Sequence, residues 1–187
     1  ANIPIEVAAV MEPLGNAVHT AFAGPLSGCN VAVTGCGPIG LFAIGVARAA
    51  GAARVFASDV SPYRLELARR MKADAVIDAG QEDFVARVHQ LTGGRGLDGV
   101  LEMSGNAQAV RDGLAALRNG GRLSLLGLPK ESFELDWNRL VIFKGITLHG
   151  IIGRRMYETW YQMDNLLASG RLDIRPAITH VMPMQEF

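Results

Sequence analysis

The sequence predicts an α/β protein, a doubly wound, six-stranded parallel sheet with helices on both faces. Three observations carry this prediction. Apolar strand patterns alternate with helix patterns, many of the 22 glycines fall between them, and aromatic residues make up only 6% of a composition rich in Val, Ile, Leu and Ala. Strands and helices that alternate at this spacing are joined by right-handed crossovers, which gives a parallel sheet covered on both faces.

The first predicted element is a helix over residues 4–22, with Pro4 at a permitted first-turn position. Pro13 and Gly15 are expected to kink or split this helix. The strands that follow are short apolar runs, at 30–34, 54–58, 75–77, 97–102, 122–126 and 146–149. The helices between and after them are expected at 38–50, 62–72, 81–92, 106–117, 137–143 and 154–169.

Polar caps, prolines and glycines set these boundaries. Ser61 is expected to cap a helix whose first residue is Pro62, because Ser accepts a hydrogen bond from a free helical N–H and Pro needs no partner there. Glycines end a helix or turn the chain at Gly51, Gly93, Gly120 and Gly170. The tail over 172–187 is expected to hold one more strand.

The composition excludes several functions. The chain has 187 residues, enough for one well-cored domain, and Lys plus Arg balance Asp plus Glu at 18 each. Without net charge or a basic run, no nucleic-acid partner is expected. The uncharged run 31–47 contains four glycines and a proline and is shorter than the roughly 20 residues of a membrane span. With no signal-peptide pattern at the start, we expect a cytoplasmic protein without a membrane partner.

A glycine motif joins the first strand of the sheet to the helix after it. Gly35, Gly37 and Gly40 form the pattern G-x-G-x-x-G, and Asp59 ends the next strand, 19 residues beyond Gly40. The first glycine allows a tight turn, the second lets the backbone approach a pyrophosphate, and the third lets the helix pack closely on the strand. The helix N-terminus, at Pro38-Ile39, offers free N–H groups to phosphates. The motif therefore predicts dinucleotide binding on a Rossmann fold.

Asp59 favours NAD over NADP, because a carboxylate at this strand end hydrogen-bonds two ribose hydroxyls and repels a 2′-phosphate. Arg64, on the next helix, is expected to lie over the adenine or beside the ribose, and its alternative is a solvated helix arginine. Two other interpretations of the motif stay open. One is a structural glycine turn with Asp59 as a helix N-terminal acid, and the other is an S-adenosylmethionine site.

Three further strand ends are candidates for the nicotinamide half of the cofactor, since the cofactor crosses the carboxyl ends of the strands. Ser104 follows the fourth strand, Leu126-Gly127-Leu128 end the fifth, and Ile151-Ile152 follow the sixth. Glycines at each end permit close approach. Core packing is the alternative for the side chains of Leu126 and Ile151.

Three longer segments together resemble a known family, Glu12–Thr20 (EPLGNAVHT), Asp59–Arg69 (DVSPYRLELAR) and Phe143–Arg154 (FKGITLHGIIGR). They are similar to the L-threonine 3-dehydrogenases of the zinc-dependent medium-chain dehydrogenase/reductase superfamily. The segments Leu101–Gly105 and Glu158–Tyr161 fit the same family, so the resemblance runs from about Ile3 to Phe187.

The resemblance implies oxidation of L-threonine at its 3-hydroxyl by NAD, with a catalytic zinc and a proton relay. By the same resemblance, Ile39, Asp59, Arg64 and the strand ends at 126–128 and 151–152 would bind NAD. Glu12 occupies the position of the family's acid near the zinc, and Arg154 matches an arginine at the active-site edge. A solvated helix acid and a surface arginine are the alternatives for these two residues.

The family's zinc ligands lie in a GroES-like domain that this sequence lacks, and neither Cys29 nor Cys36 has a second ligand at metal spacing. We therefore expect no metal site here and no threonine turnover by this chain alone. The expected organisation is a connecting helix from the missing domain over 1–24, the NAD-binding domain over 25–170, and a segment over 171–187 that returns to the missing domain.

The resemblance also implies dimers and tetramers that form through the edge strand near 146–150. His19 lies two helical turns from Glu12, so the two would share a face if the helix were continuous. Two rival functions remain at this point. The chain is the cofactor domain of a related NAD-dependent polyol or alcohol dehydrogenase, or it is a stand-alone NAD-binding or redox-sensing module.

Overall fold

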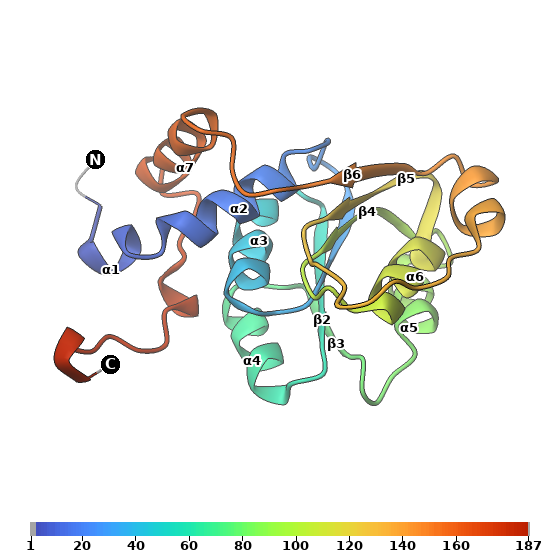
Figure 1. Cartoon of the computed structure of the whole chain (residues 1–187), viewed down its shortest axis with the longest axis horizontal. Helices are drawn as coiled ribbons and strands as arrows, with labels where there is room; N and C mark the ends of the chain where they lie inside the picture. The colour runs from blue at the N-terminus through green and yellow to red at the C-terminus, as the bar shows by residue number, and fades with distance from the viewer. Residues whose placement is uncertain (1–2, 187) are drawn as a thin grey trace.

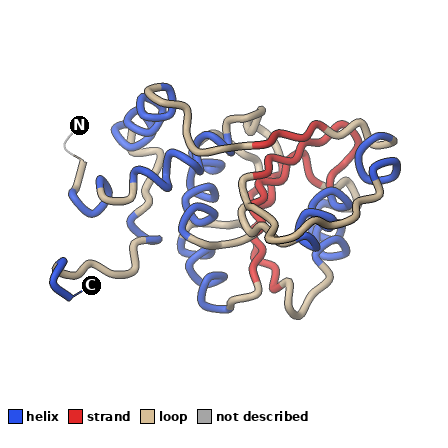
Figure 2. Tube along the Cα trace, in the orientation of Figure 1, coloured by secondary structure: helices blue, strands red, loops and turns tan. Residues whose placement is uncertain are grey.

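A computed structural model describes residues 3–186 and shows one sheet of six parallel strands in the order β3-β2-β1-β4-β5-β6 (Figures 1 and 2). The strands are β1 (Asn30–Thr34), β2 (Arg54–Asp59), β3 (Ala75–Asp78), β4 (Leu97–Glu102), β5 (Leu117–Leu125) and β6 (Thr147–Gly150). The strand order reverses between β1 and β4, which are neighbours in the sheet. This topology confirms the predicted fold class and puts the switch point at the predicted glycine motif.

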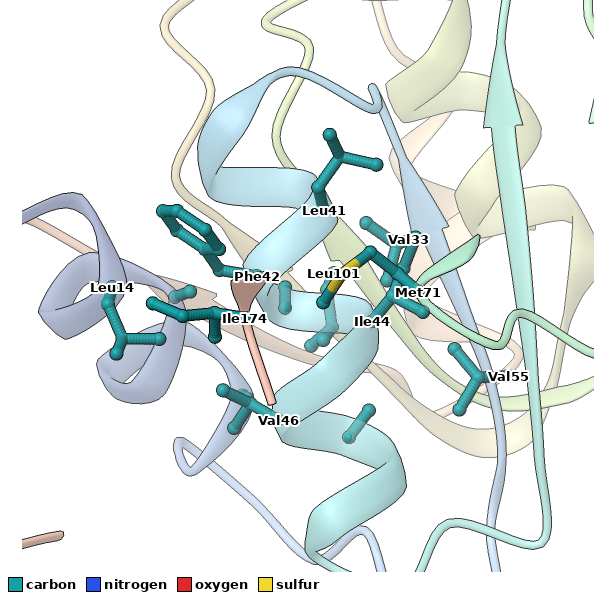
Figure 3. Close-up of a cluster of buried hydrophobic side chains, with 14 of the residues drawn as sticks. Leu14, Val33, Leu41, Phe42, Ile44, Val46, Val55, Met71, Leu101 and Ile174 are labelled. Carbon is teal, nitrogen blue, oxygen red and sulfur yellow. The ribbon is translucent and has the colours of Figure 1, made fainter. Parts of the chain in front are cut away.

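Helices cover both faces of the sheet (Figure 1). They are α1 (Ile5–Ala8), α2 (Met11–Ala21), α3 (Pro38–Ala49), α4 (Pro62–Arg70), α5 (Phe84–Thr92), α6 (Ala107–Ala116) and α7 (Glu158–Ala168). One buried cluster packs α2, α3 and α4 on the sheet, and Leu14, Phe42 and Ile174 lie in it (Figure 3). A second cluster packs α5 and α6 on the opposite face, around Phe56 and Leu114.

The N-terminal helix divides at a different place from the one predicted. The break lies at Ala9-Val10, between α1 and α2, and α2 runs unbroken through Pro13 and Gly15. Pro13 is the third residue of α2, where a backbone N–H has no helical partner, so its ring costs no hydrogen bond. The prediction that these two residues split the helix was wrong.

Buried Arg122 ties the end of α2 to the sheet. From β5, its Nη2 donates to the carbonyls of Ala21 at 3.1 Å and Gly24 at 3.2 Å, and its Nη1 donates to Ser124 Oγ at 2.7 Å. These carbonyls belong to the last residue of α2 and the turn after it, where helical partners have run out. Burial lowers the pKa of Arg122 below its usual value.

Several other helices and strands begin at residues different from those predicted. α5 begins at Phe84 because Asp83 caps it, accepting a hydrogen bond from Ala86 N at 2.9 Å. α7 begins at Glu158 rather than 154. β5 begins earlier than predicted, at Leu117, and its pairing with β4 shifts register between Leu97 and Gly99. The short helix predicted at 137–143 forms as one π-helical turn, Asn138–Ile142.

The strand predicted in the tail does not form over residues 172–186, which hold two 3₁₀ turns, Arg175–Ala177 and Met184–Glu186. Leu172 and Ile174 are buried in the core beside α3 and α4 instead of pairing with the sheet. Phe187 lies outside the described residues. No helix in the described range 3–186 has the length and apolar character that a bilayer crossing requires.

Candidate cofactor-binding site

The glycine loop between β1 and α3 has the geometry that the sequence predicts. Gly35 has a φ of +88°, and a Cβ there would lie 2.8 Å from the backbone of Ser104. A Cβ on Gly40 would lie 1.9 Å from the carbonyl oxygen of Gly35, so no side chain fits. A Cβ on Gly37, in contrast, would meet nothing within 4 Å. Gly35 and Gly40 are therefore required by the fold, and Gly37 borders open space.

That open space lies at the N-terminus of α3. Pro38 is the first residue of the helix, and the first hydrogen bond into it runs from Leu41 N to the Gly37 carbonyl. The N–H groups of Ile39 and Gly40 precede this bond and have no helical partner. Free N–H groups and the positive end of a helix dipole form a phosphate site.

Asp59 lies at the end of β2 beside this loop, and its side chain is 5% exposed. Its Oδ2 accepts a hydrogen bond from Cys36 N at 2.7 Å, and its Oδ1 accepts one from Ser61 N at 2.9 Å. The Arg64 guanidinium approaches Oδ2 at 3.8 Å, with its side chain half exposed. Asp59 therefore also anchors the glycine loop, a task that sequence reasoning missed.

A pocket of about 430 Å³ opens between these groups. Five predicted site residues line it, namely Gly35, Gly37, Asp59, Arg64 and Ser104. Its other walls include Val60, Ala79, Phe84, Gln108 and Asp112, which the sequence analysis did not name. Val60 and Ala79 follow β2 and β3, Phe84 begins α5, and Gln108 and Asp112 lie in the first two turns of α6, so the strand order, once known, brings these elements together.

The ends of β5 and β6 lie further along the same edge of the sheet. Leu126 N and Gly127 N both donate to the Glu102 carbonyl, at 3.0 and 3.1 Å, and Ile151 N donates to the Leu125 carbonyl at 2.9 Å. The side chains predicted to meet the nicotinamide half differ in exposure. Leu126 and Ile151 are half-buried, whereas Leu128 is 87% exposed and Ile152 is 89% exposed.

Glu12 and Arg154, far apart in the sequence, form an ion pair at 2.8 Å. Arg154 lies across α2 at Gly15, where an added Cβ would be 2.9 Å from Arg154 Cδ. His19 lies on the same face of α2 as Glu12, and its Nδ1 is 2.9 Å from the Gly153 carbonyl oxygen. The expectation that a continuous helix puts Glu12 and His19 on a shared face is therefore confirmed.

The thiol of Cys36 lies under the glycine loop and is buried. Its Sγ donates to the Ser58 carbonyl at 3.6 Å. Burial raises the pKa of Cys36 to about 12, and the nearby Asp59 carboxylate acts in the same direction. A thiol that stays protonated at neutral pH is a packing residue of the loop rather than a nucleophile.

The described residues do not form a zinc site. Within 3–186, no three His, Cys, Asp or Glu side chains lie close enough together to hold a metal ion. Glu12 is engaged by Arg154, and Cys29 and Cys36 lie at opposite ends of β1.

The loop, the carboxylate and the strand order together define a dinucleotide-binding domain of the Rossmann class. A family model described as "Zinc-binding dehydrogenase" matches residues 38–169. The chain belongs to this zinc-binding dehydrogenase family.

Among curated proteins, the chain is 49% identical over 187 residues to an L-threonine 3-dehydrogenase of Bacillus licheniformis, covering 100% of this chain and 54% of that protein. It is 50% identical to one of Symbiobacterium thermophilum, covering 99% of the chain and 53% of the relative. It is 49% identical to one of Pyrococcus horikoshii, covering 96% of the chain and 51% of the relative. The chain thus spans about half the length of the curated relatives it matches.

Solved structures of dehydrogenases share the fold. The 2R,3R-butanediol dehydrogenase of Bacillus subtilis matches with a TM-score of 0.84 at 30% identity, over 93% of this chain and 49% of that one. The alcohol dehydrogenase TADH of Thermus sp. ATN1 matches with a TM-score of 0.80 at 36% identity, over 94% and 50%.

Proposed function

We propose that this chain is the NAD-binding domain of an L-threonine 3-dehydrogenase and binds NAD along the carboxyl edge of its sheet. The observation that carries the proposal is the open space at Gly37, bordered by free helical N–H groups on one side and by Asp59 on the other. In this arrangement the N–H groups of Ile39 and Gly40 receive the pyrophosphate, and Asp59 receives the adenosine ribose.

The rest of the cofactor follows the edge of the sheet. Bound NAD supplies the acceptor for hydride. The loop over 126–128 and the residues Ile151 and Ile152 flank its nicotinamide half, and the exposed side chains of Leu128 and Ile152 gain apolar cover there. Arg64, beside Asp59 at the pocket wall, lies against the ribose or adenine.

The relatives support one choice of substrate. The three L-threonine 3-dehydrogenases described above match this chain at 49–50% identity, whereas the butanediol and alcohol dehydrogenases match at 30–36% in the solved structures. L-threonine is therefore the proposed substrate of the complete enzyme, and a polyol or alcohol is the alternative that the solved structures support. Glu12 and Arg154 lie at the edge facing that substrate, and Glu12 serves the proton relay.

Three further proposals concern the complete enzyme. The helices α1 and α2 connect this domain to a zinc-carrying GroES-like domain, and residues 171–187 lead back to it. Copies associate through β6, whose partner in the described sheet is β5 on one side only, giving dimers and a tetramer. The enzyme acts in the cytoplasm in threonine catabolism.

Calorimetric titration with NAD and with NADP tests the cofactor. The chain is expected to bind NAD more tightly, and Asp59→Ala is expected to weaken NAD by about 10-fold or more while NADP changes less, because the variant removes both the ribose acceptor and the charge that repels a 2′-phosphate. Ser61→Ala, which removes the cap of α4 but no ribose contact, is the matched control. An unchanged preference for NAD in Asp59→Ala would contradict the assignment.

A further inference from the structure

A second buried carboxylate lies at the same edge of the sheet. Glu102, the last residue of β4, is 0% exposed, and its Oε1 accepts hydrogen bonds from Ser104 N at 2.8 Å and Gly105 N at 3.1 Å. The Ser104 hydroxyl donates to the same oxygen. All of these partners are donors, and an ionised carboxylate is the form that only accepts.

Within residues 3–186, the Glu102 carboxylate forms no ion pair with a Lys, Arg or His side chain. Every ion pair recorded within residues 3–186 involves another acid, among them Asp59, Asp98 and Asp74. Burial raises the pKa of the Glu102 carboxyl above its usual value, although the hydrogen bonds from Ser104 and Gly105 oppose that shift. Buried charges in proteins are normally paired, so an unpaired one points to a ligand.

The surroundings of Glu102 place it between the pocket and the end of β5. Ser104, which it holds, lines the pocket and packs on Gly35 of the phosphate loop. On the other side, a Cβ on Gly127 would lie 2.5 Å from Glu102 Oε2. Gly127 sits in the 126–128 loop, which flanks the nicotinamide half in the proposed function.

We propose that the Glu102 carboxylate is the countercharge for the positively charged nicotinamide ring of oxidised NAD, so that Glu102 raises the affinity for the oxidised cofactor relative to the reduced one. The inference rests on the proposed function, because it requires NAD at this edge. The Glu102 charge also repels the negative pyrophosphate. That repulsion is the same for both redox forms and cancels when their affinities are compared. The ring charge is the only charge that differs between them.

The test is calorimetric titration of the wild type and of Glu102→Gln with NAD and with NADH. The variant keeps the shape of the side chain and removes its charge. The affinity for NAD is expected to fall about 5-fold further than the affinity for NADH, the scale of one charge acting through protein. Equal losses for both forms would overturn the proposal and leave Glu102 with a role in holding the loops alone.

Asp98→Asn is the matched control, because Asp98 is a buried carboxylate on the same strand at the opposite edge of the sheet. It is expected to leave the ratio of the two affinities unchanged, and a change equal to that of Glu102→Gln would also overturn the proposal. If the wild type binds neither redox form, the proposed function itself fails.

A second measurement uses only the wild type, so it tests the proposal even if the Glu102→Gln variant does not fold. The wild type is titrated with benzamide adenine dinucleotide, which has the shape of oxidised NAD and a neutral ring. NAD is expected to bind about 5-fold more tightly than this analogue. Equal affinity would contradict a countercharge role for Glu102.

Discussion

The two ends of β4 carry two buried carboxylates, and they differ in how the fold treats their charge. At the amino end, Asp98 accepts hydrogen bonds from Arg118 Nε at 2.6 Å, Arg95 Nη2 at 3.2 Å and Asn30 N at 2.7 Å. At the carboxyl end, Glu102 has hydroxyl and backbone donors and no cation among residues 3–186.

The pKa values of the two acids shift in opposite directions for this reason. Burial alone would raise the pKa of Asp98, but the hydrogen bonds from Arg118 and Asn30 outweigh it and the pKa is lowered. For Glu102 burial dominates and the pKa is raised. At the amino end of β4 the carboxylate is paired with two arginines of the same domain, whereas at the carboxyl end Glu102 has only neutral donors within residues 3–186. Stability and binding should therefore separate along this one strand.

The largest effect is expected from Gly40→Ala, at the carboxyl edge. The new Cβ collides with the Gly35 carbonyl at 1.9 Å, so the loop must move. We expect NAD binding to be lost and the free energy of unfolding to fall by about 3 kcal/mol. Gly37→Ala is the control, because its Cβ enters open space and its φ of −68° suits alanine. It should fold normally and bind NAD weakly, and normal NAD binding by Gly40→Ala would refute this view of the loop.

The two cysteines lie at opposite ends of β1, and their thiols are expected to differ in reactivity. Cys36, at the carboxyl end of β1, has a pKa of about 12 and is buried, whereas Cys29 precedes the amino end and is half-buried. At pH 8, alkylation of native Cys36 should be at least about 100-fold slower than alkylation of Cys29, as measured by mass spectrometry. Comparable rates would show that the loop opens readily.

The Cys36 thiol also makes the free energy of unfolding depend on pH in alkaline solution. An unfolded chain ionises Cys36 near its ordinary pKa of 9.0, while the folded chain holds the proton to about 12. The folded state therefore binds more protons in this window, and its stability falls as pH rises through it. Cys36→Ala removes that dependence, which denaturant unfolding between pH 8 and pH 10 will measure.

Asp98→Asn removes the charge of the paired carboxylate at the amino end of β4. The free energy of unfolding should fall by about 2 kcal/mol, since charge-assisted hydrogen bonds to Arg118 and Asn30 N are weakened. Because the folded pKa of Asp98 lies below 3.8, its contribution is present above that pH and is lost as pH falls through the folded pKa. Unfolding curves at pH 7 and pH 3 should differ less in the variant, while NAD affinity stays within about 2-fold. A loss of NAD affinity in Asp98→Asn would contradict the separation of stability from binding along β4.

The smallest effect is expected from Glu12→Gln. Glu12 is 60% exposed in its ion pair with Arg154, so solvent screens the interaction. The free energy of unfolding should change by less than about 1 kcal/mol. A larger change, measured by urea unfolding with Glu66→Gln as an exposed control, would mean that this pair helps to hold the domain together.

The fold could be predicted from local signals, and parts of the site could not. The alternation of strands and helices and the spacing of Gly35, Gly37 and Gly40 ahead of Asp59 are local patterns, so the fold class and the phosphate loop could be predicted from the sequence. The strand order comes from the structure. The Glu12–Arg154 contact joins residues 142 positions apart, and only the packing of Arg154 over Gly15 reveals it. Glu102 lies within the Leu101–Gly105 segment that resembles the family, but its lack of a cationic partner within residues 3–186 depends on what surrounds it in three dimensions.

The arginine that fastens the end of α2 to the sheet does so through a side chain that lysine could not replace. Arg122 grips the last carbonyls of that helix with a rigid planar group, from a strand whose far end leads into the 126–128 loop. The planar guanidinium fixes the direction of both hydrogen bonds, so the end of α2 and β5 are held in one relative geometry. Lysine, with one flexible ammonium group, would fix neither direction.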